Sequence, residues 1–258
     1  MPRGLGLKGV AALRLKKFRT LQKRFVAEGL TLVSELLDSR LKVVELYGTQ
    51  EFYRDCPFAS RVPVSACHVV AESQLRKISS LSEPNEVLAV CEIPSDPFDP
   101  SLGKEELCLV LDDIRDPGNL GTLIRAADWF GIPAVLCSPE TVDCYNPKVV
   151  QATMGSIARV RVFTVDLVPF LEEAALTRPV YGAVLRAASV YTEELSPTGL
   201  LVLGNESRGI SPEVQAVLTH RISIPSYARN AASAESLNVG VAGAVLCAEF
   251  RRRFPLTR

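Results

Sequence analysis

Short apolar runs alternate with segments of helical periodicity through the last three-fifths of the chain. Runs typical of buried strands lie at residues 107–111, 134–137, 158–163, 180–185, 200–203 and 221–224. Segments with helical spacing of apolar residues lie at 120–130, 147–154, 167–176, 212–219 and 235–252. Strands that alternate with helices predict an α/β fold with a mostly parallel sheet covered on both faces. Ligands of such sheets bind beyond the carboxyl ends of the strands.

The first third of the chain has a looser pattern. A helix is predicted near 30–37 and another near 73–79, with strands near 43–47 and 87–91. Residues 93–105 hold three prolines and a glycine among several charges, which is typical of a linker. We therefore expect a small α/β domain at 1–92, a linker at 93–105 and a larger domain at 106–258.

Composition narrows the class of protein. Apolar residues make up 47% of the chain, but no apolar stretch reaches the roughly 20 residues that a membrane span needs. The seven cysteines are scattered without Cys-x-x-Cys spacing, and the chain has two histidines. A zinc cluster or a disulfide framework is therefore not expected. We expect a cytoplasmic protein that uses neither a membrane nor a metal.

The charge is balanced overall but basic at the start, where eight lysines and arginines precede the first acidic residue, Glu28. This run allows three interpretations: a solvated helix face, an organelle presequence or contacts to phosphates. A presequence is the weakest of the three, because the run continues without a break into an apolar segment and is poor in serine. On composition alone the solvated face is favoured.

The first strand-exit loop follows residues 107–111 and contains a tight Pro117-Gly118 turn. Asn119 is placed to cap the next helix, whose N-terminal amides can face a ligand. Arg125 falls outside the apolar face of that helix. By spacing alone its favoured role is an ion pair with Asp128 at i+3.

The second strand-exit loop runs from Leu203 to Ser211. Gly204 and Gly209 bracket Asn205 and Glu206, an arrangement that suits close approach of the backbone to a bound molecule. The alternative is that Glu206 only caps the helix that starts at Ser211. The glycine spacings of dinucleotide and triphosphate sites are absent from this loop.

The third segment passes from Ile224 through small residues into a helix expected at 235–252. Between Leu237 and Ala248 every residue except Asn238 is apolar or glycine, so we expect this helix to be buried on all sides. A buried asparagine needs hydrogen-bond partners. Asn238 could be part of a functional site, or it could be purely structural and donate a hydrogen bond to a loop carbonyl.

Together these segments resemble the motifs of the SpoU/TrmH family of RNA ribose methyltransferases, within the SPOUT superfamily. The matching stretches are DPGNLGTLIRAADWFG, LVLGNESRGIS, ISIP and ESLNVGVAGAVLCAEF. The resemblance covers nearly all of residues 107–254. Upstream, KKFRTLQKRFVAEGLTLVSELL is more loosely similar to the RNA substrate-binding domain of the family. This resemblance makes phosphate contact the preferred interpretation of the basic N-terminal run.

The resemblance implies a fold, a reaction and partners. It implies a C-terminal trefoil knot, a homodimer, S-adenosylmethionine bound in the knot, and methyl transfer to a ribose 2′-hydroxyl of structured RNA, ribosomal or transfer RNA, without a metal. The implied catalytic residues are Arg125, Asn119, Glu206, Ser236 and Asn238. The implied cofactor-binding residues are Leu203, Gly204, Asn205, Ile224 and Leu237. The residues expected to contact RNA are Lys16, Lys17, Arg19 and Arg24.

Two roles are open for Arg125: the base that removes the 2′-hydroxyl proton, or a charge that positions phosphate and stabilises the developing alkoxide. A guanidinium is effectively always protonated in proteins, which favours the second role. The chain departs from the family pattern in its longer, glycine-free loop at 226–235 and in Ser207, where glycine is common. A non-catalytic RNA-binding or ribosome-assembly factor is therefore the alternative function. A nucleotide-dependent oxidoreductase ranks third.

Overall fold

The computed structural model describes residues 5–56, 61–228 and 234–255. Their contacts group the chain into two compact units, the first formed by residues 1–96 and 143–159 and the second by 97–142 and 160–258. The chain thus leaves the second unit after Val142, contributes a segment to the first, and returns at Val160. The domains expected at 1–92 and 106–258 stay a prediction, since the contacts do not divide the chain with a single cut.

The first unit contains a four-stranded mixed sheet in the order β1-β4-β2-β3. Its strands are β1 (Arg24–Glu28), β2 (Val43–Gly48), β3 (Cys67–Val69) and β4 (Val87–Glu92). Its helices are α1 (Gly6–Ala12), α2 (Lys16–Gln22), α3 (Leu30–Leu37), α4 (Gln50–Asp55) and α5 (Glu72–Ile78). The predicted helices and strands of this region are present, whereas α1, α2, β1, α4 and β3 were not predicted.

The junction of α2 and β1 shows why part of this unit escaped prediction. Lys23 takes a left-handed backbone conformation with φ 53°, which ends α2 one residue before β1 begins. Glycine and asparagine are the residues that usually signal such a conformation. A lysine within a basic run gives no comparable signal.

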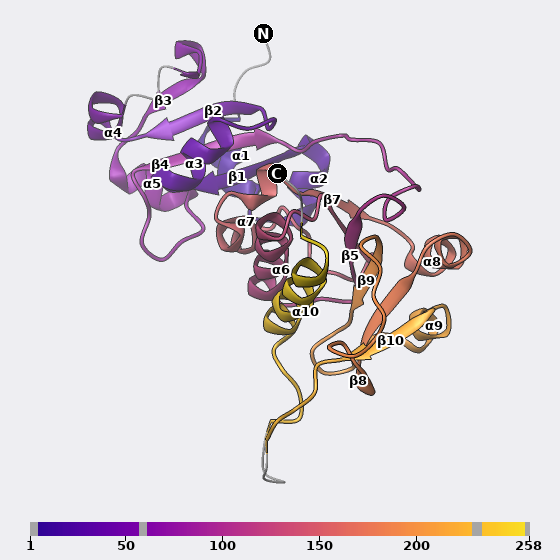
Figure 1. Ribbon diagram of the computed structural model, residues 1–258. Coiled ribbons are helices and arrows are strands. Elements are labelled where there is room, and N and C mark those ends of the chain that lie inside the picture. Colours follow the sequence, from indigo (N-terminus) through magenta and orange to yellow (C-terminus); the bar gives the residue numbers. More distant parts are fainter. Residues whose placement is uncertain (1–4, 57–60, 229–233, 256–258) are drawn as a thin grey trace. The chain divides into compact units, whose positions relative to one another are not determined.

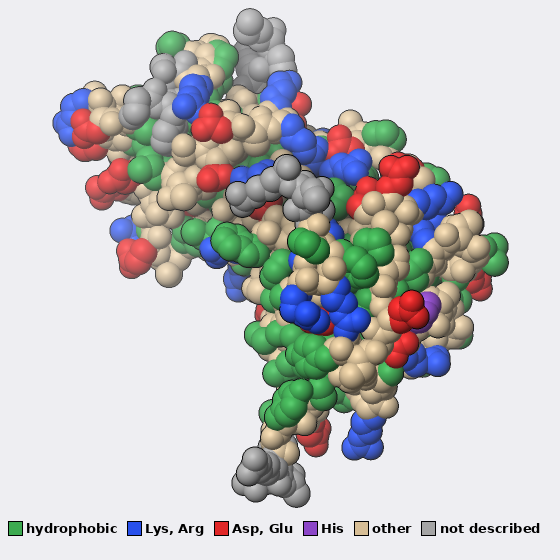
Figure 2. All heavy atoms as spheres, viewed as in Figure 1, with side chains coloured by type: hydrophobic (Ala, Val, Ile, Leu, Met, Phe, Trp, Pro, Cys, Tyr) green, Lys and Arg blue, Asp and Glu red, His purple; other side chains and the backbone are tan. Residues whose placement is uncertain are grey.

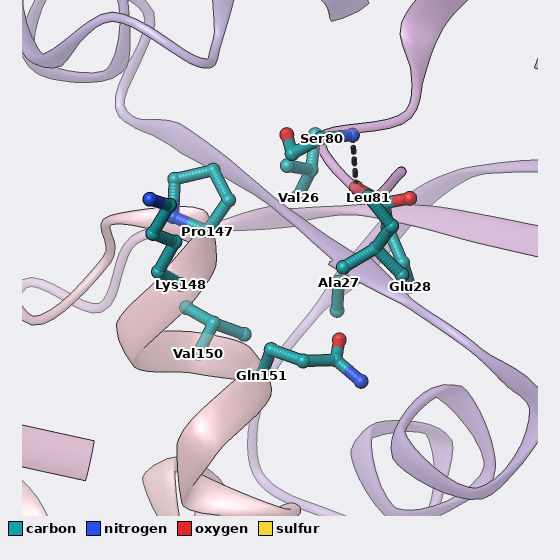
Figure 3. A pocket seen from close by; sticks show the side chains of 9 residues that line it. All are labelled: Val26, Ala27, Glu28, Ser80, Leu81, Pro147, Lys148, Val150 and Gln151. Atoms are coloured by element: carbon teal, nitrogen blue, oxygen red, sulfur yellow. Dashed lines mark hydrogen bonds between the residues drawn. The ribbon is translucent and has the colours of Figure 1, made fainter. Parts of the chain in front are cut away.

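The segment 143–159 adds helix α7 (Pro147–Thr153) to the first unit, where it packs on β1 (Figure 3). Asn146 caps this helix by accepting a hydrogen bond from the backbone N–H of Lys148, and Pro147 occupies the first helical position. Val149 and Val150 are buried. Between α7, β1 and residues 80–81 lies a cavity of about 20 Å³, room for roughly one water molecule and too small for a nucleoside.

A buried ion pair joins α2 to the same segment. Arg19 is 2% exposed, and its Nε and Nη2 donate to Oδ2 of Asp143 at 2.9 and 2.6 Å. Its Nη1 donates to the carbonyls of Leu13 and Arg14, each at 2.8 Å. Because the guanidinium is buried and bonded within the unit, the expectation that Arg19 contacts RNA does not fit this structure. The sequence could not reveal a partner that lies 124 residues away.

The second unit contains a six-stranded sheet in the order β10-β8-β9-β5-β6-β7, and every strand pair is parallel (Figure 1). The strands are β5 (Leu107–Leu111), β6 (Ala134–Cys137), β7 (Arg161–Thr164), β8 (Val180–Ser189), β9 (Gly199–Leu203) and β10 (His220–Ser223). The predicted parallel α/β sheet is confirmed. Residue 158, expected in a strand, instead ends a short 3-10 helix, Ser156–Ala158.

Helices cover both faces of this sheet. Alternate residues of a strand point to opposite faces, and Val110 and Val202 join a core with α8 (Leu167–Ala175) and α9 (Pro212–Ala216). On the other face, Leu203 lies against Gly243 of α10 (Val239–Arg253), which also meets Leu123 of α6 (Pro117–Trp129). A Cβ at Gly243 would overlap Leu123 and crowd Leu203, so the glycine permits this close packing.

Helix α10 differs from the prediction in its start and in its burial. It begins at Val239 rather than at 235, because the side chain of Asn238 caps it by accepting from the backbone N–H of Val241 at 3.2 Å. The helix is not buried on all sides, since Val241 is 50% exposed and Ala248 is exposed as well. An apolar stripe of α10 therefore remains uncovered in the single chain.

Arginines fasten the C-terminal end of α10. Arg251 donates to the carbonyls of Phe130 and Gly131 at 2.6 and 3.0 Å, and Arg253 donates to the carbonyl of Val190 at 2.7 Å. Glu249 accepts from Arg252 and Arg253, and the hydrogen bond from Arg252 is the main cause that lowers the pKa of Glu249 to about 2. These contacts hold the last helix against neighbouring loops. The trefoil knot implied by the family resemblance stays a prediction.

Within the described helices, none combines the length and the apolar content needed to cross a bilayer.

The ion pair of Arg19 gives a test of the link between α2 and the segment 143–159. Arg19→Met keeps the length of the side chain but leaves Asp143 and two carbonyls without their donor, so we expect the free energy of unfolding to fall by about 3 kcal/mol. Urea denaturation of the full chain measures the change. Arg54→Met is the control, because Arg54 pairs with Asp55 on the surface. Equal stability of the two variants would contradict a structural role for Arg19.

Candidate functional site

The predicted loops meet where the order of the strands reverses. From β5 the chain adds β6 and β7 on one side, then returns to place β9 and β8 on the other, so that β5 and β9 are neighbours. In open parallel sheets this switch point is where a crevice for ligands forms, at the carboxyl ends of the strands. The loops that leave β5 at Asp112 and β9 at Gly204 lie at this edge.

The cap of α6 is Asp116 and not Asn119. The Asp116 carboxylate accepts from the backbone N–H of Asn119 at 2.8 Å, and Pro117 stands at the first helical position. An aspartate followed by proline is a recognised start of a helix, and this signal could have identified the cap. Since Asn119 is not the cap, its side chain is available for contacts with other loops.

Asn119 connects the other two predicted motifs. Its Nδ2 donates to Oε1 of Glu206 at 2.6 Å, and its Oδ1 accepts from Nδ2 of Asn238 at 2.8 Å. The Asn238 Oδ1 in turn accepts from the N–H of Val241 at the start of α10. Residues from three separate strand-exit segments thus form one chain of hydrogen bonds. Asn238 is exposed, and the expectation that it is buried was wrong.

The alternative role of Glu206 as a helix cap is not seen. The backbone N–H of Ser211 donates to Asp112 Oδ2 at 2.7 Å, so Asp112 takes the position considered for Glu206. The glutamate instead stays exposed at the tip of its loop, with Asn119 as its hydrogen-bond donor.

The loop after β9 is folded tightly on itself. The backbones of Asn205 and Gly209 pair in an antiparallel bridge, and Asn205 Oδ1 accepts from the N–H groups of Ser207 and Arg208 at 2.9 and 3.2 Å. A Cβ at Gly204 would overlap the backbone of Gly209 and Ile210, so only glycine fits at this position. Ser207 has no left-handed backbone conformation, which explains why a residue other than glycine is accommodated there.

Arg125 is exposed on the side of α6 that also carries Thr122. Thr122 lies against Gly240 next to Asn238, which brings this face of α6 to the start of α10. Among the described residues no hydrogen bond or ion pair of the Arg125 guanidinium is found. Arg125 therefore presents an exposed cation one helical turn beyond Thr122.

The expected cofactor-binding residues are only partly brought together. Leu203, Gly204 and Asn205 lie at the end of β9 beside the Asn119 network. Ile224 follows β10, which β8 separates from β9. Ser236 and Leu237 are exposed just before the cap of α10, and residues 229–233 of the long loop lie outside the described residues.

The basic N-terminal residues lie in the first unit. Lys16 and Lys17 are exposed on α2, whereas Arg24 donates to the buried carboxylate of Glu45 at 3.1 Å and is mostly covered. The described residues contain no group of three or more His, Cys, Asp or Glu side chains that could hold a metal ion. The use of a metal stays untested by this finding.

Comparisons with known proteins agree with this arrangement. Residues 106–248 match the SpoU rRNA Methylase family, and residues 6–89 match the MRM3-like substrate binding domain. The 23S rRNA (guanosine(2553)-2′-O)-methyltransferase RlmP of Bacillus subtilis (strain 168) is 32% identical over 246 residues, which cover 93% of each protein.

Two solved structures are similar over nearly the whole chain. One, from Porphyromonas gingivalis and described as of the TrmH family of RNA methyltransferases, has a TM-score of 0.84 at 39% identity and covers 98% of this chain and 99% of its own. The other, an AdoMet-bound rRNA methyltransferase from Sinorhizobium meliloti, has a TM-score of 0.82 at 30% identity and covers 97% and 95%. The matches confirm the resemblance seen in the sequence, and the chain belongs to the SpoU rRNA methylase family.

Proposed function

We propose that the protein transfers the methyl group of S-adenosylmethionine to a ribose 2′-hydroxyl of ribosomal or transfer RNA. The observation that carries this function is the hydrogen-bonded chain of Glu206, Asn119 and Asn238, which joins three strand-exit segments beside the exposed Arg125. The family match and the AdoMet-bound relative support the reaction and the cofactor. Ribosomal RNA is the favoured substrate class, because the similar Bacillus subtilis enzyme is named for it.

The chain offers a suitable place for the methyl donor. S-adenosylmethionine supplies a methyl group on a positively charged sulfur, which makes the carbon open to attack by an oxygen. Gly204, with no side chain, lets the β9 loop turn back sharply, and backbone groups of Leu203, Asn205, Ile224 and Leu237 complete the set of residues proposed to bind the donor. The half-buried side chain of Ile224 and the exposed side chain of Leu237 suit an adenine ring, and backbone amides and carbonyls of the set suit its polar edge.

Arg125 acts on the substrate rather than on the protein. A 2′-hydroxyl is a weak nucleophile, and negative charge develops on its oxygen as its proton is lost to solvent. Formation of the new oxygen–carbon bond would be matched by cleavage of the methyl–sulfur bond, so that the donor would leave as neutral S-adenosylhomocysteine. A permanently charged guanidinium stabilises that charge and binds a neighbouring phosphate of the RNA. The Arg125 guanidinium donates no hydrogen bond to the described protein residues. It is therefore available both to stabilise the charge on the oxygen and to bind a phosphate.

The Glu206–Asn119–Asn238 chain positions the site. It fixes the β9 loop and the start of α10 relative to α6, the helix that carries Arg125. Catalysis depends on such rigid placement of the reacting groups. Ser236 is proposed to contact the substrate from the segment before α10, where its side chain is exposed. Lys16 and Lys17 of the first unit are proposed to contact RNA phosphates.

The active form is proposed to be a homodimer. Trp129 at the end of α6 is 84% exposed, and Leu237 and Val241 at the start of α10 are also exposed. Figure 2 shows hydrophobic side chains gathered over α10 and the segment that leads to it. A contiguous apolar surface of this kind usually marks an interface. The seven free thiols suit a reducing cytoplasm, which is the proposed location.

Removal of the Arg125 charge should stop methyl transfer without loss of donor binding. For Arg125→Ala we expect transfer of labelled methyl from S-adenosylmethionine to unmodified rRNA to fall about 100-fold or more. Calorimetry should give an unchanged Kd for the donor. Arg221→Gln is the control, because Arg221 is an exposed arginine at the start of β10, away from the carboxyl ends of the strands. Donor binding without methyl transfer by the unaltered protein would instead favour a non-catalytic RNA-binding factor.

Asn119→Asp tests the hydrogen-bonded chain. The substitution sets a carboxylate against that of Glu206, where the atoms now bonded are 2.6 Å apart. Two carboxylates this close share a proton at low pH and repel at high pH. We expect the donor to bind the variant more weakly at pH 8 than at pH 5.5, with little pH dependence in the unaltered protein.

The double variant Asn119→Asp with Glu206→Gln is the matched control for that experiment. In this variant the amide of residue 206 donates a hydrogen bond to the carboxylate of residue 119, the reverse of the original direction. The pH dependence of S-adenosylmethionine binding should therefore disappear. A pH dependence that persists in the double variant would show that the hydrogen bond between these two side chains is not its cause.

The proposed dimer can be tested on α10. Val241→Asp places a charge in the exposed apolar stripe, so the mass measured by light scattering after size exclusion should fall from that of two chains to that of one. Val64→Asp is the control, because Val64 is exposed in the first unit. A single-chain mass for the unaltered protein would refute the dimer.

A further inference from the structure

A pair of arginines lies beside the proposed catalytic chain and has no part in it. Arg115 precedes α6, and Arg208 lies in the loop after β9, two residues beyond Glu206. Both are held by one carboxylate: Arg115 Nε donates to Asp113 Oδ1 at 2.7 Å, and Arg208 Nη2 donates to Asp113 Oδ2. Each arginine side chain is more than three-fifths exposed, while that of Asp113 is 15% exposed.

The backbone around Asp113 fixes this arrangement. Asp113 has a left-handed conformation with φ 56°, which aspartate tolerates better than most residues. Its backbone carbonyl accepts from Asn205 Nδ2 at 2.8 Å, and its N–H donates to Ser138 Oγ at 3.0 Å. Asp113 is therefore held at the switch point, bonded to Asn205, the residue before Glu206.

The cluster of Arg115, Arg208 and Asp113 keeps a net positive charge and N–H groups that are available to a ligand. One carboxylate faces two guanidinium groups, so the three side chains together carry one positive charge. Each guanidinium has five N–H donors and gives one hydrogen bond to the described part of the chain. The remaining donors face solvent in a planar arrangement that matches two oxygens of a phosphate.

The proposed RNA substrate carries phosphate groups that could bind to this cluster. Every internal ribose of an RNA chain carries a phosphodiester on each side, so an enzyme that acts on a 2′-hydroxyl must accommodate phosphates next to its reacting groups. Arg125 accounts for one such contact. The second pair of cations, Arg115 and Arg208, lies in the loops that leave β5 and β9, at the same edge of the sheet.

We propose that Arg115 and Arg208, gathered by Asp113, form a binding site for a backbone phosphate next to the methylated nucleotide. This inference rests on the proposed function for the identity of the ligand. In the absence of RNA, Asp113 holds the two guanidinium groups ready. When RNA binds, their unused donors contact phosphate oxygens while the contacts to Asp113 persist.

The test measures RNA binding at several salt concentrations, without methyl transfer. The probes are unmodified rRNA and a short single-stranded oligouridylate, bound to the full chain and to the variants Arg115→Gln, Arg208→Gln and their combination. Each lost phosphate contact lowers the slope of log K against log salt concentration by about 0.7. We expect that decrease for each single variant, a larger one for the combination, and weaker binding of both RNA probes.

Two further variants separate a phosphate contact from a structural role. Arg208→Lys keeps the charge, so the salt slope should be retained even where affinity falls with the loss of paired donors. Arg221→Gln removes an exposed arginine elsewhere in the same unit and should leave the slope unchanged. Calorimetry with S-adenosylmethionine, performed on every variant, should give the Kd of the unaltered protein.

Three results would overturn the proposal: an unchanged salt slope in both glutamine variants, the same decrease in the control, or loss of donor binding together with the slope. Loss of donor binding together with the slope would show that the arginines stabilise the loop after β9 rather than bind phosphate. Because RNA binding is measured directly, the arginine site and the proposed reaction fail in different experiments. Unaltered protein that binds RNA through these arginines but transfers no methyl group would refute the reaction alone.

Discussion

The carboxamide of Asn119 is the group on which the geometry of the site depends. It has a donor end, used on Glu206, and an acceptor end, used by Asn238. A carboxylate of the same size could accept from Asn238 but could not donate to Glu206, and an apolar side chain could do neither. The chain of hydrogen bonds therefore has a direction, from the N–H of Val241 at the start of α10 to the carboxylate of Glu206. The positive end of the helix dipole and the negative charge lie at its two ends, an arrangement that favours both.

Close packing of the last helix makes that alignment possible. Gly240 lies against Thr122, and Gly243 lies between Leu123 and Leu203, so the backbone of α10 approaches both α6 and the sheet. The arginines near the end of α10 then bind carbonyls of the loops that follow α6 and β8. The helix is held at its first residue by Asn238 and at its last turn by these cations. Between these two anchors Val241 and Ala248 stay exposed.

The sequence predicts the second unit better than the first, for physical reasons. The central strands β5, β6 and β9 are buried throughout and form continuous apolar runs, which made this part of the parallel sheet predictable. In the first unit, α2 and β1 meet at Lys23 without a glycine or proline, and the pattern gives no boundary there.

The hydrogen-bond and ion-pair partners of polar side chains were harder to predict from the sequence than the helices and strands. Spacing along the chain indicated that Asn119, Glu206 and Asn238 matter, through the family motifs, but not that Asn119 joins the other two. It also gave Arg19 the same apparent role as its exposed neighbours Lys16 and Lys17, because the carboxylate that binds it lies far along the chain. The hydrophobic pattern reports burial of elements. The pairing of charges depends on tertiary contacts that no local pattern contains.

The insertion of α7 into the first unit has a consequence for the order in which the protein is made. Synthesis proceeds from the N-terminus, and domains usually fold as they emerge. Here the strand β1 waits for Val149 and Val150 to cover it, and Arg19 waits for Asp143. By the time that segment has been made, β5, α6 and β6 of the second unit already exist. The first unit therefore cannot finish folding until residues 143–159 have left the ribosome, after synthesis of the second unit has begun.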